Sequence, residues 1–178
     1  MSNADAIIEL KDYIRDVPDF PKPGIMFKDI TTLIKHPDAF RASILQLADR
    51  YRDSGITKVV GIEARGFIFA AALAYEMGIG MVPVRKLGKL PAQCVQETYE
   101  LEYGTDVVEM HSDALEKDEL VLVLDDVIAT GGTLLAACKL VEVLGANVAE
   151  TAAVVELEFL EGRRRLEGRP FFSLIRYS

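Results

Sequence analysis

The chain contains the stretch Val121-Leu-Val-Leu-Asp125-Asp126-Val-Ile-Ala129-Thr130-Gly131-Gly132-Thr133, and the order of residue types in it decides the fold. Four apolar residues lead into two adjacent carboxylates. A turn rich in glycine and threonine follows, and an amphipathic run then covers residues 134–144. This order predicts a buried parallel strand over 120–124, a tight loop and the start of a helix.

The loop between that strand and that helix has the composition of an anion-binding site. Two glycines at a helix start leave several backbone N–H groups unpaired, and the helix dipole adds partial positive charge. A phosphate is stabilised at such a helix start, and threonine hydroxyls can donate further hydrogen bonds to it. We therefore predict a phosphate-binding loop formed by Ala129, Thr130, Gly131, Gly132 and Thr133.

Asp125 and Asp126 come directly before this loop, so they should face the group attached to the phosphate. Carboxylates accept hydrogen bonds from hydroxyls, which suits a sugar with vicinal hydroxyl groups. The alternative is that an aspartate at a strand end only caps the following helix. Two consecutive aspartates followed by Ala-Thr-Gly-Gly-Thr favour the sugar phosphate.

The rest of the chain alternates strands with helices. Residue spacing predicts a short helix over 3–15 and then an extended, turned segment that contains Pro18, Pro21, Pro23 and Gly24. The following elements are expected after it: a helix over 38–53, a strand over 58–62, a buried helix over 66–77, a strand over 81–84, a hairpin over 94–110, a strand over 148–156, and a small helix and final strand in the tail. This alternation predicts a single α/β domain over 1–178, with ligands beyond the carboxyl ends of a mostly parallel sheet.

The composition argues against several classes of protein. A net charge of −8 over 178 residues counts against a duplex nucleic-acid partner, which usually needs a basic patch. No Gly-Lys-Ser/Thr occurs, and Gly78-Ile-Gly80 lacks the third glycine of a dinucleotide fingerprint. No apolar run is long enough to span a bilayer, and no secretory signal is visible. Cys94 and Cys138 match no metal or redox spacing, so reduced thiols in the cytoplasm are expected.

Two further segments should lie at the carboxyl end of the sheet. Glu63, Ala64 and Arg65 follow the strand 58–62, and their backbone amides and guanidinium suit a second phosphate or a pyrophosphate. Read alone, the segment could equally be a capped helix start with a surface arginine. The cations of the next segment are Arg85, Lys86 and Lys89. A basic run is usually a solvated face, but in an acidic chain a cluster at a strand end favours a polyphosphate.

The hairpin expected over 94–110 carries the run Thr98-Tyr-Glu-Leu-Glu-Tyr-Gly104. Long exposed hairpins often act as lids that exclude water from a site. A carboxylate on such a lid could exchange a proton with a reacting base. Spacing alone slightly favours the alternative, a polar hairpin without a chemical role.

Together these segments resemble the adenine phosphoribosyltransferases, a family of type I phosphoribosyltransferases. Residues 121–133 resemble the motif that binds 5-phosphoribosyl-1-pyrophosphate (PRPP), and other segments match the family in its own order. Those segments are Pro18-Asp-Phe-Pro-Lys-Pro-Gly24-Ile-Met26-Phe27-Lys28-Asp29-Ile-Thr31, Gly61-Ile-Glu-Ala-Arg-Gly-Phe67, Arg85-Lys-Leu-Gly-Lys-Leu-Pro91, Tyr99-Glu-Leu-Glu-Tyr-Gly104 and Phe171-Phe-Ser-Leu174. Lys28 stands where some members of the family carry arginine.

The resemblance implies the type I phosphoribosyltransferase fold and the reaction adenine + PRPP ⇌ AMP + pyrophosphate, a step of purine salvage, with Mg²⁺. The fold would carry a small hood, from about 1–34 and 157–178, and a flexible lid hairpin over about 94–110. The resemblance also implies a homodimer, in which Arg85 reaches towards the neighbouring site, with no nucleic-acid or membrane partner.

The resemblance also implies a role for each site residue. Asp125, Asp126 and the phosphate-binding loop would hold the ribose and its phosphate, and Mg²⁺ would be bound through the substrate with Asp125 and Asp126 as candidate ligands. Pyrophosphate would contact Glu63, Ala64, Arg65, Arg85, Lys86 and Lys89. The family has a non-proline cis peptide in the loop that carries Glu63, Ala64 and Arg65. Adenine would contact Met26, Phe27 and Leu157, and the lid would supply the catalytic Glu102 with Tyr103 beside it, while Arg65 would assist catalysis at the pyrophosphate.

Two alternatives stay open on the sequence alone. An enzyme of the same fold could use hypoxanthine or xanthine, because residue patterns do not count hydrogen bonds to a base. A regulatory protein could keep the PRPP-binding fold and bind nucleic acid, although the acidic charge and the chain length argue against it.

Overall fold

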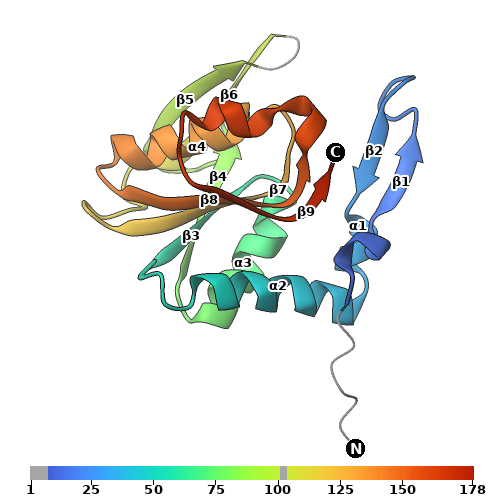
Figure 1. Cartoon of the computed structure of the whole chain (residues 1–178). Coiled ribbons are helices and arrows are strands. Elements are labelled where there is room, and N and C mark those ends of the chain that lie inside the picture. Colours follow the sequence, from blue (N-terminus) through green and yellow to red (C-terminus); the bar gives the residue numbers. More distant parts are fainter. Residues whose placement is uncertain (1–7, 101–103) are drawn as a thin grey trace, which may run out of the picture.

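The structure is a computed structural model that describes residues 8–100 and 104–178. Its centre is a seven-stranded sheet in the order β5-β6-β4-β3-β7-β8-β9 (Figure 1). The strands of this sheet are β3 (Lys58–Ile62), β4 (Gly80–Lys86), β5 (Cys94–Glu100), β6 (Thr105–His111), β7 (Leu120–Ile128), β8 (Asn147–Leu157) and β9 (Phe171–Tyr177). Strands β4, β3, β7, β8 and β9 pair in parallel, and β5 and β6 form the expected antiparallel hairpin, which confirms the mixed, mostly parallel sheet.

The direction in which the chain moves across the sheet reverses between β3 and β7. From β3 the chain passes through α3 (Gly66–Met77) to β4, and from β7 it passes through α4 (Gly132–Val143) to β8, on the opposite side. Ligands of open α/β sheets bind beyond the carboxyl ends of the strands at such a reversal. The carboxyl ends of β3 and β7 are therefore where a site is expected.

Helices cover both faces of the sheet. Helices α2 (Pro37–Tyr51) and α3 pack on one face, and α4 packs on the other (Figure 1). The buried run of α3 explains its position, because Phe69 and Leu73 are fully buried against the sheet and α2. Gly78 ends α3 in the left-handed conformation, with φ of 68°. A separate apolar cluster lies under α4.

The N-terminal part differs from the sequence-based expectation. The helix predicted over 3–15 is wrong where the structure describes it: a short 3-10 helix, η1 (Leu10–Tyr13), is followed by strand β1 (Arg15–Pro18). Strand β1 pairs antiparallel with β2 (Met26–Asp29) in a small separate sheet, which leads into α1 (Thr31–Ile34). The helical spacing is thus realised only in the one short turn of η1, and the chain is extended from Arg15, where it pairs with β2. Figure 1 shows this sheet standing beside the C-terminal end of the chain.

Several strands are longer than their apolar runs suggested. Strand β7 continues through both aspartates to Ile128, because its parallel pairing with β8 continues to Ile128 and Glu156. Strand β4 likewise includes Arg85 and Lys86, which pair with β6. Asp125, Asp126, Arg85 and Lys86 therefore belong to the last residues of strands, whereas Glu63, Arg65 and Lys89 lie in the loops after them. The tail forms η2 (Glu158–Leu160), η3 (Gly162–Leu166) and the edge strand β9, which confirms a small helix and a final strand.

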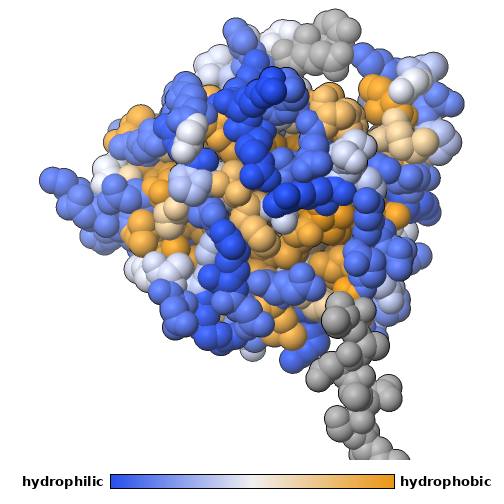
Figure 2. Space-filling view, viewed as in Figure 1, coloured by the Kyte–Doolittle hydropathy of each residue, from blue (hydrophilic) through white to orange (hydrophobic). Residues whose placement is uncertain are grey.

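The lid hairpin is joined to the sheet more firmly than an exposed hairpin would be. Val108 and Met110 of β6 are buried, and Tyr99 of β5 packs in the same apolar cluster. Figure 2 shows the molecule from the same side as Figure 1. On that face of the molecule, apolar residues cover the middle and hydrophilic side chains cross them. No helix within the described ranges is long and apolar enough to cross a membrane.

Candidate active site

The predicted phosphate-binding loop follows β7 and includes the first two residues of α4. Gly131 precedes the helix with φ of 80°, and α4 has no side-chain cap. Its first backbone N–H groups therefore face a small cavity of about 80 Å³, lined by Asp125 and the residues of 127–134. The helix-capping alternative for the two aspartates is wrong, because neither side chain caps α4. An uncapped helix start around a cavity of this size suits a phosphate group.

Asp125 and Asp126 are both buried at the end of β7. Asp125 lies against the start of α3, and its Oδ1 accepts a hydrogen bond of 2.8 Å from the Asp126 backbone N–H. Burial and the neighbouring Asp126 carboxylate raise the pKa of Asp125 well above its ordinary range. Asp126 forms an ion pair with Arg65, with 2.7 Å between Oδ2 and Nε.

The Asp126 Oδ2 can still accept a hydrogen bond. The Arg65 N–H is close but not aligned with it, so this buried oxygen accepts no hydrogen bond from the described residues. Unsatisfied buried oxygens are uncommon and call for a partner. A ligand hydroxyl or a hard cation would satisfy it.

The segment from Glu63 to Arg65 connects β3 to α3, next to the end of β7. The peptide bond between Glu63 and Ala64 is cis, which agrees with the family resemblance. Helix α3 starts after Arg65 without a side-chain cap, so the capped-helix alternative for this segment is wrong as well. Two uncapped helix starts, from opposite faces of the sheet, thus lie at adjacent strand ends.

Glu63 holds the end of β4. Its carboxylate accepts hydrogen bonds from the Arg85 guanidinium, at 3.0 and 3.3 Å, and from the Lys86 backbone N–H at 2.9 Å. The pKa of Glu63 is lowered, mainly by the hydrogen bonds from Arg85. Arg85 is therefore paired within its own chain, and only part of its side chain is open to a second partner.

The structure directs the Lys86 side chain towards the lid hairpin. Its ammonium donates to Asp106 and to the Tyr99 hydroxyl, which also lies 3.2 Å from Asp106. Burial lowers the pKa of Lys86, but these hydrogen bonds outweigh that effect and the pKa is raised overall. Glu102 and Tyr103 lie outside the residues that the structure describes.

Sequence analysis did not identify Glu109 as part of the site. This buried carboxylate of β6 accepts hydrogen bonds of 3.0 Å from the backbone N–H groups of Lys89 and Leu90. It thereby holds the loop that follows β4 and carries Lys89. Nothing in its local sequence marks it, because its role depends on the pairing of β6 with β4.

An apolar pocket of about 310 Å³ lies on the other side of Arg65. Phe27 forms one wall, with the Arg65 guanidinium 5.5 Å from its ring centre and Phe20 edge-on at 5.1 Å. The expected residues Met26, Phe27 and Leu157 all line it. Arg65 and Ala129, which were expected to contact phosphate groups, also line it. Sequence analysis did not assign the remaining four to the site, which are Ile25, Lys28, Val127 and Leu160. An aromatic wall with the Arg65 guanidinium over it fits a flat, partly polar ring.

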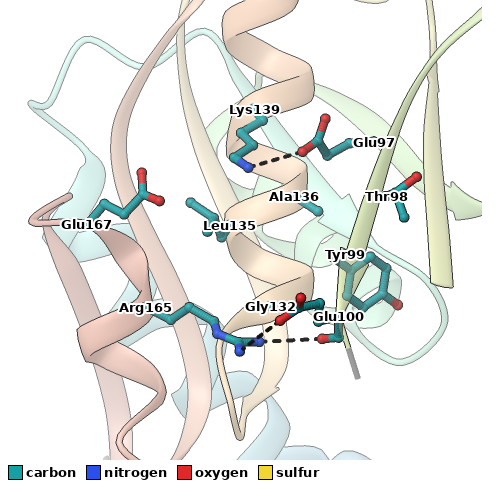
Figure 3. A pocket seen from close by; sticks show the side chains of 10 residues that line it. All are labelled: Glu97, Thr98, Tyr99, Glu100, Gly132, Leu135, Ala136, Lys139, Arg165 and Glu167. Atoms are coloured by element: carbon teal, nitrogen blue, oxygen red, sulfur yellow. Dashed lines mark hydrogen bonds and ion pairs between the residues drawn. The ribbon is translucent and has the colours of Figure 1, made fainter. Parts of the chain in front are cut away.

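A third cavity, of about 290 Å³, separates the lid strand β5 from α4 and η3 (Figure 3). Arg165 reaches across it and donates a long hydrogen bond of 3.4 Å to the Glu100 carbonyl oxygen. Lys139 of α4 pairs with Glu97 of β5 at 3.1 Å. These contacts hold the stem of the hairpin against α4, beside the phosphate-binding loop.

The described residues contain no cluster of three or more histidine, cysteine or acidic side chains that could hold a metal ion by themselves. Mg²⁺ commonly keeps several waters and takes one or two carboxylates together with substrate phosphates. The buried Asp126 Oδ2, which lacks an aligned hydrogen bond, suits that kind of shared coordination.

The matched family model describes a phosphoribosyl transferase domain, and residues 29–169 match it. A protein of Solibacter usitatus called adenine phosphoribosyltransferase is 57% identical, over 95% of this chain and 98% of its own. The adenine phosphoribosyltransferase structure from Thermoanaerobacter pseudethanolicus has a TM-score of 0.92 and 50% identity, and covers 95% of this chain and 98% of its own.

Some of the similar structures hold ligands. The adenine phosphoribosyltransferase of Saccharomyces cerevisiae, complexed with adenine and D-2,5-dideoxy-2,5-imino-altritol 1,6-bisphosphate, has a TM-score of 0.88 and 44% identity. It covers 93% of this chain and 96% of its own. The recurrence of the fold over almost the whole of both chains confirms the fold class expected from the sequence.

The pairing of Glu63 with Arg85 can be tested by titration. Replacing Arg85 with methionine removes the main cause of the low pKa, so we expect the pKa of Glu63 to rise towards its ordinary value of 4.5. Because the folded-state pKa is depressed, the pairing stabilises the fold above that value and is lost as the pH falls. NMR titration of labelled glutamate carboxyl carbons measures the shift.

Arg52→Met is the matched control, since Arg52 pairs with Asp49 on the surface. It should leave the titration of Glu63 unchanged. An unchanged Glu63 titration in Arg85→Met would show that the pair does not persist in solution.

Proposed function

This chain belongs to the adenine phosphoribosyltransferase family. We propose that the small cavity beside Asp126 binds the phosphoribosyl part of PRPP and that the apolar pocket beside Arg65 binds adenine. The family reaction is adenine + PRPP ⇌ AMP + pyrophosphate. The observation that carries the assignment is the ion pair of Arg65 and Asp126. It lies between a phosphate-sized cavity on one side and an apolar pocket on the other.

The 5-phosphate of PRPP would occupy the phosphate-binding loop. The uncapped N-terminus of α4 supports this, because its N–H groups and dipole favour an anion. The ribose hydroxyls would then lie near Asp125 and Asp126. Asp126 is the stronger candidate to accept from them, since its Oδ2 has no aligned donor among the described residues.

The pyrophosphate would lie at the end of β3. Its negative charge suits the start of α3, the Arg65 guanidinium and the basic residues Arg85, Lys86 and Lys89. Arg85 and Lys86 already have carboxylate partners, so each would have to interact with the ligand and with its carboxylate at the same time. When bound, Mg²⁺ would neutralise part of the charge on the pyrophosphate and ribose oxygens, with Asp126 and Asp125 as its candidate protein ligands.

Adenine would fill the apolar pocket against Phe27. The pocket is lined on its other side by Leu157, Leu160 and Val127. The backbone of Met26, in β2, would meet the edge of the base. A few hydrogen bonds would let such a pocket distinguish adenine from other purines, because a buried donor or acceptor left unpaired is costly.

Positioning and charge stabilisation would supply most of the catalysis. The base displaces pyrophosphate at the anomeric carbon, through a transition state with oxocarbenium character. Arg65 would stabilise charge on the leaving pyrophosphate, and Asp126 would stabilise the cationic sugar. The lid hairpin would exclude the water that hydrolyses PRPP, and Glu102 on it would accept the proton that adenine loses.

We further propose a homodimer in the cytoplasm. Large apolar residues are exposed along α3 and after β4, namely Ile68, Tyr75 and Leu87. Burying them against a second copy would remove apolar surface from water and would bring the Arg85 region close to the partner. Cys94 and Cys138 are both free thiols, which suits a reducing compartment.

The choice of base is tested by competition. With PRPP and Mg²⁺ present, we expect adenine to be consumed and hypoxanthine, guanine and xanthine to be left, because the residues 18–31 resemble the adenine-recognition segment. Chromatography of an equimolar purine mixture measures this. Comparable turnover of a 6-oxopurine would falsify the adenine assignment.

Asp126→Asn tests the ribose assignment. Losing a charged acceptor for a partly buried sugar hydroxyl should cost about 1–3 kcal/mol of PRPP affinity. Adenine affinity should change much less, because the base contacts the other pocket. Calorimetry with each substrate measures the two effects, and equal losses would show that Asp126 is not a ribose anchor.

Glu102→Gln tests proton transfer from the lid. A positioned acid–base group contributes about 10²–10⁴-fold, so kcat should fall by that range with little change in the adenine KM. Glu100→Gln is the matched control and should do much less, since Glu100 is exposed. Near-normal single-turnover rates in Glu102→Gln would remove the assignment and leave the lid only its closing role.

A further inference from the structure

The back of the phosphate-binding loop rests on a segment more than 30 residues later in the chain. Gly162, the first residue of η3, is buried and packs directly against the loop backbone. A Cβ placed on Gly162 would lie 2.2 Å from the Ala129 carbonyl oxygen and 3.0 Å from the Gly131 backbone nitrogen. A Cβ placed on Gly131 would lie 2.3 Å from the Gly162 carbonyl oxygen. The contact is therefore backbone against backbone, with no space for a side chain on either side.

The segment that carries Gly162 is held in place at several points. Arg163 donates two hydrogen bonds, of 3.0 and 2.7 Å, to the buried Glu156 of β8, which also accepts from Ser173 at 2.6 Å. Leu166 is fully buried under α4, and Arg169 pairs with Glu142 of that helix at 2.8 Å. These anchors, at Arg163, Leu166 and Arg169, all lie in the chain directly after Gly162, so η3 cannot move away easily from a crowded loop.

We propose that Gly162 is a positioning residue for the 5-phosphate of PRPP. Its missing side chain lets η3 press against the loop and fixes the direction of the N–H groups that bind the phosphate. Since Gly162 does not touch substrate, it acts through Ala129 and Gly131. The inference rests on the proposed role of the phosphate-binding loop.

The size of the expected distortion follows from the contact. The 2.2 Å between the added Cβ and the Ala129 carbonyl oxygen is about 1 Å shorter than an ordinary carbon–oxygen contact. In Gly162→Ala the loop peptide must therefore move by about 1 Å. Displacements of about 1 Å in a binding site can cost on the order of 10²-fold. Gly162 lies outside the left-handed region, so alanine can adopt its backbone conformation and the effect is one of crowding.

The experiment is steady-state kinetics with both substrates, together with calorimetric titration of AMP. In Gly162→Ala we expect KM for PRPP and Kd for AMP to rise about tenfold or more, while KM for adenine changes less than about twofold. Gly80→Ala is the matched control: its Cβ would meet only the flexible Lys58 side chain, at the far end of β4. It should leave all three constants unchanged.

Two more variants make every outcome informative. Glu156→Gln weakens the anchor of η3 without adding bulk, so it should shift the same constants in the same direction by a smaller factor, and it tests the inference if Gly162→Ala does not fold. Thr130→Val removes a hydroxyl of the loop itself and should raise KM for PRPP. If Thr130→Val has no effect, the loop assignment is wrong. If Thr130→Val weakens PRPP binding but Gly162→Ala and Glu156→Gln do not, the positioning role of Gly162 is overturned.

Discussion

Two uncapped helix starts, brought together by the reversal between β3 and β7, are the constraint on which the site depends. Helices α3 and α4 cover opposite faces of the sheet, yet both begin at the same edge of it. Each start exposes backbone N–H groups and the positive end of a dipole. In the proposed function, these two helix starts would let an acidic chain hold two phosphate groups without a large basic surface.

The side chains around these helix starts are balanced in charge. Arg65 pairs with Asp126, Arg85 with Glu63 and Lys86 with Asp106. In the free protein each cation is held near the place where a substrate would need it. Holding side chains in advance reduces the entropy lost on binding, although the carboxylate partners must then share their cations with the ligand.

Much of the fold and of the site could be predicted from the sequence. The run from Val121 to Thr133 indicated a buried strand, a glycine-rich turn and a helix, because each of those requires a distinct residue pattern. The motifs of 18–31, 61–67 and 85–91 identified the family and the residues Met26, Phe27 and Arg65 of the apolar pocket. Local patterns and motifs were sufficient to predict those parts of the site that are built from neighbouring residues of one loop.

The remainder depended on contacts between distant segments. The helix predicted over 3–15 is reduced, within the described residues, to the short η1, and the chain then extends from Arg15 to pair with β2. Glu109 and Gly162 gained their roles from the pairing of β6 with β4 and from the packing of η3 on the phosphate-binding loop. Neither has a local sequence pattern, so only the assembled structure identifies them.

The stretch from Leu157 to Leu166 has a consequence for how this enzyme could be altered. Within ten residues it lines the apolar pocket, supports the phosphate-binding loop through Gly162 and reaches the lid strand through Arg165. An insertion that enlarged the base pocket at Leu160 would also shift the supports of the phosphate and of the lid. Specificity for a new base is therefore easier to change by side-chain exchange in β2 than by exchanging this loop for one of another length.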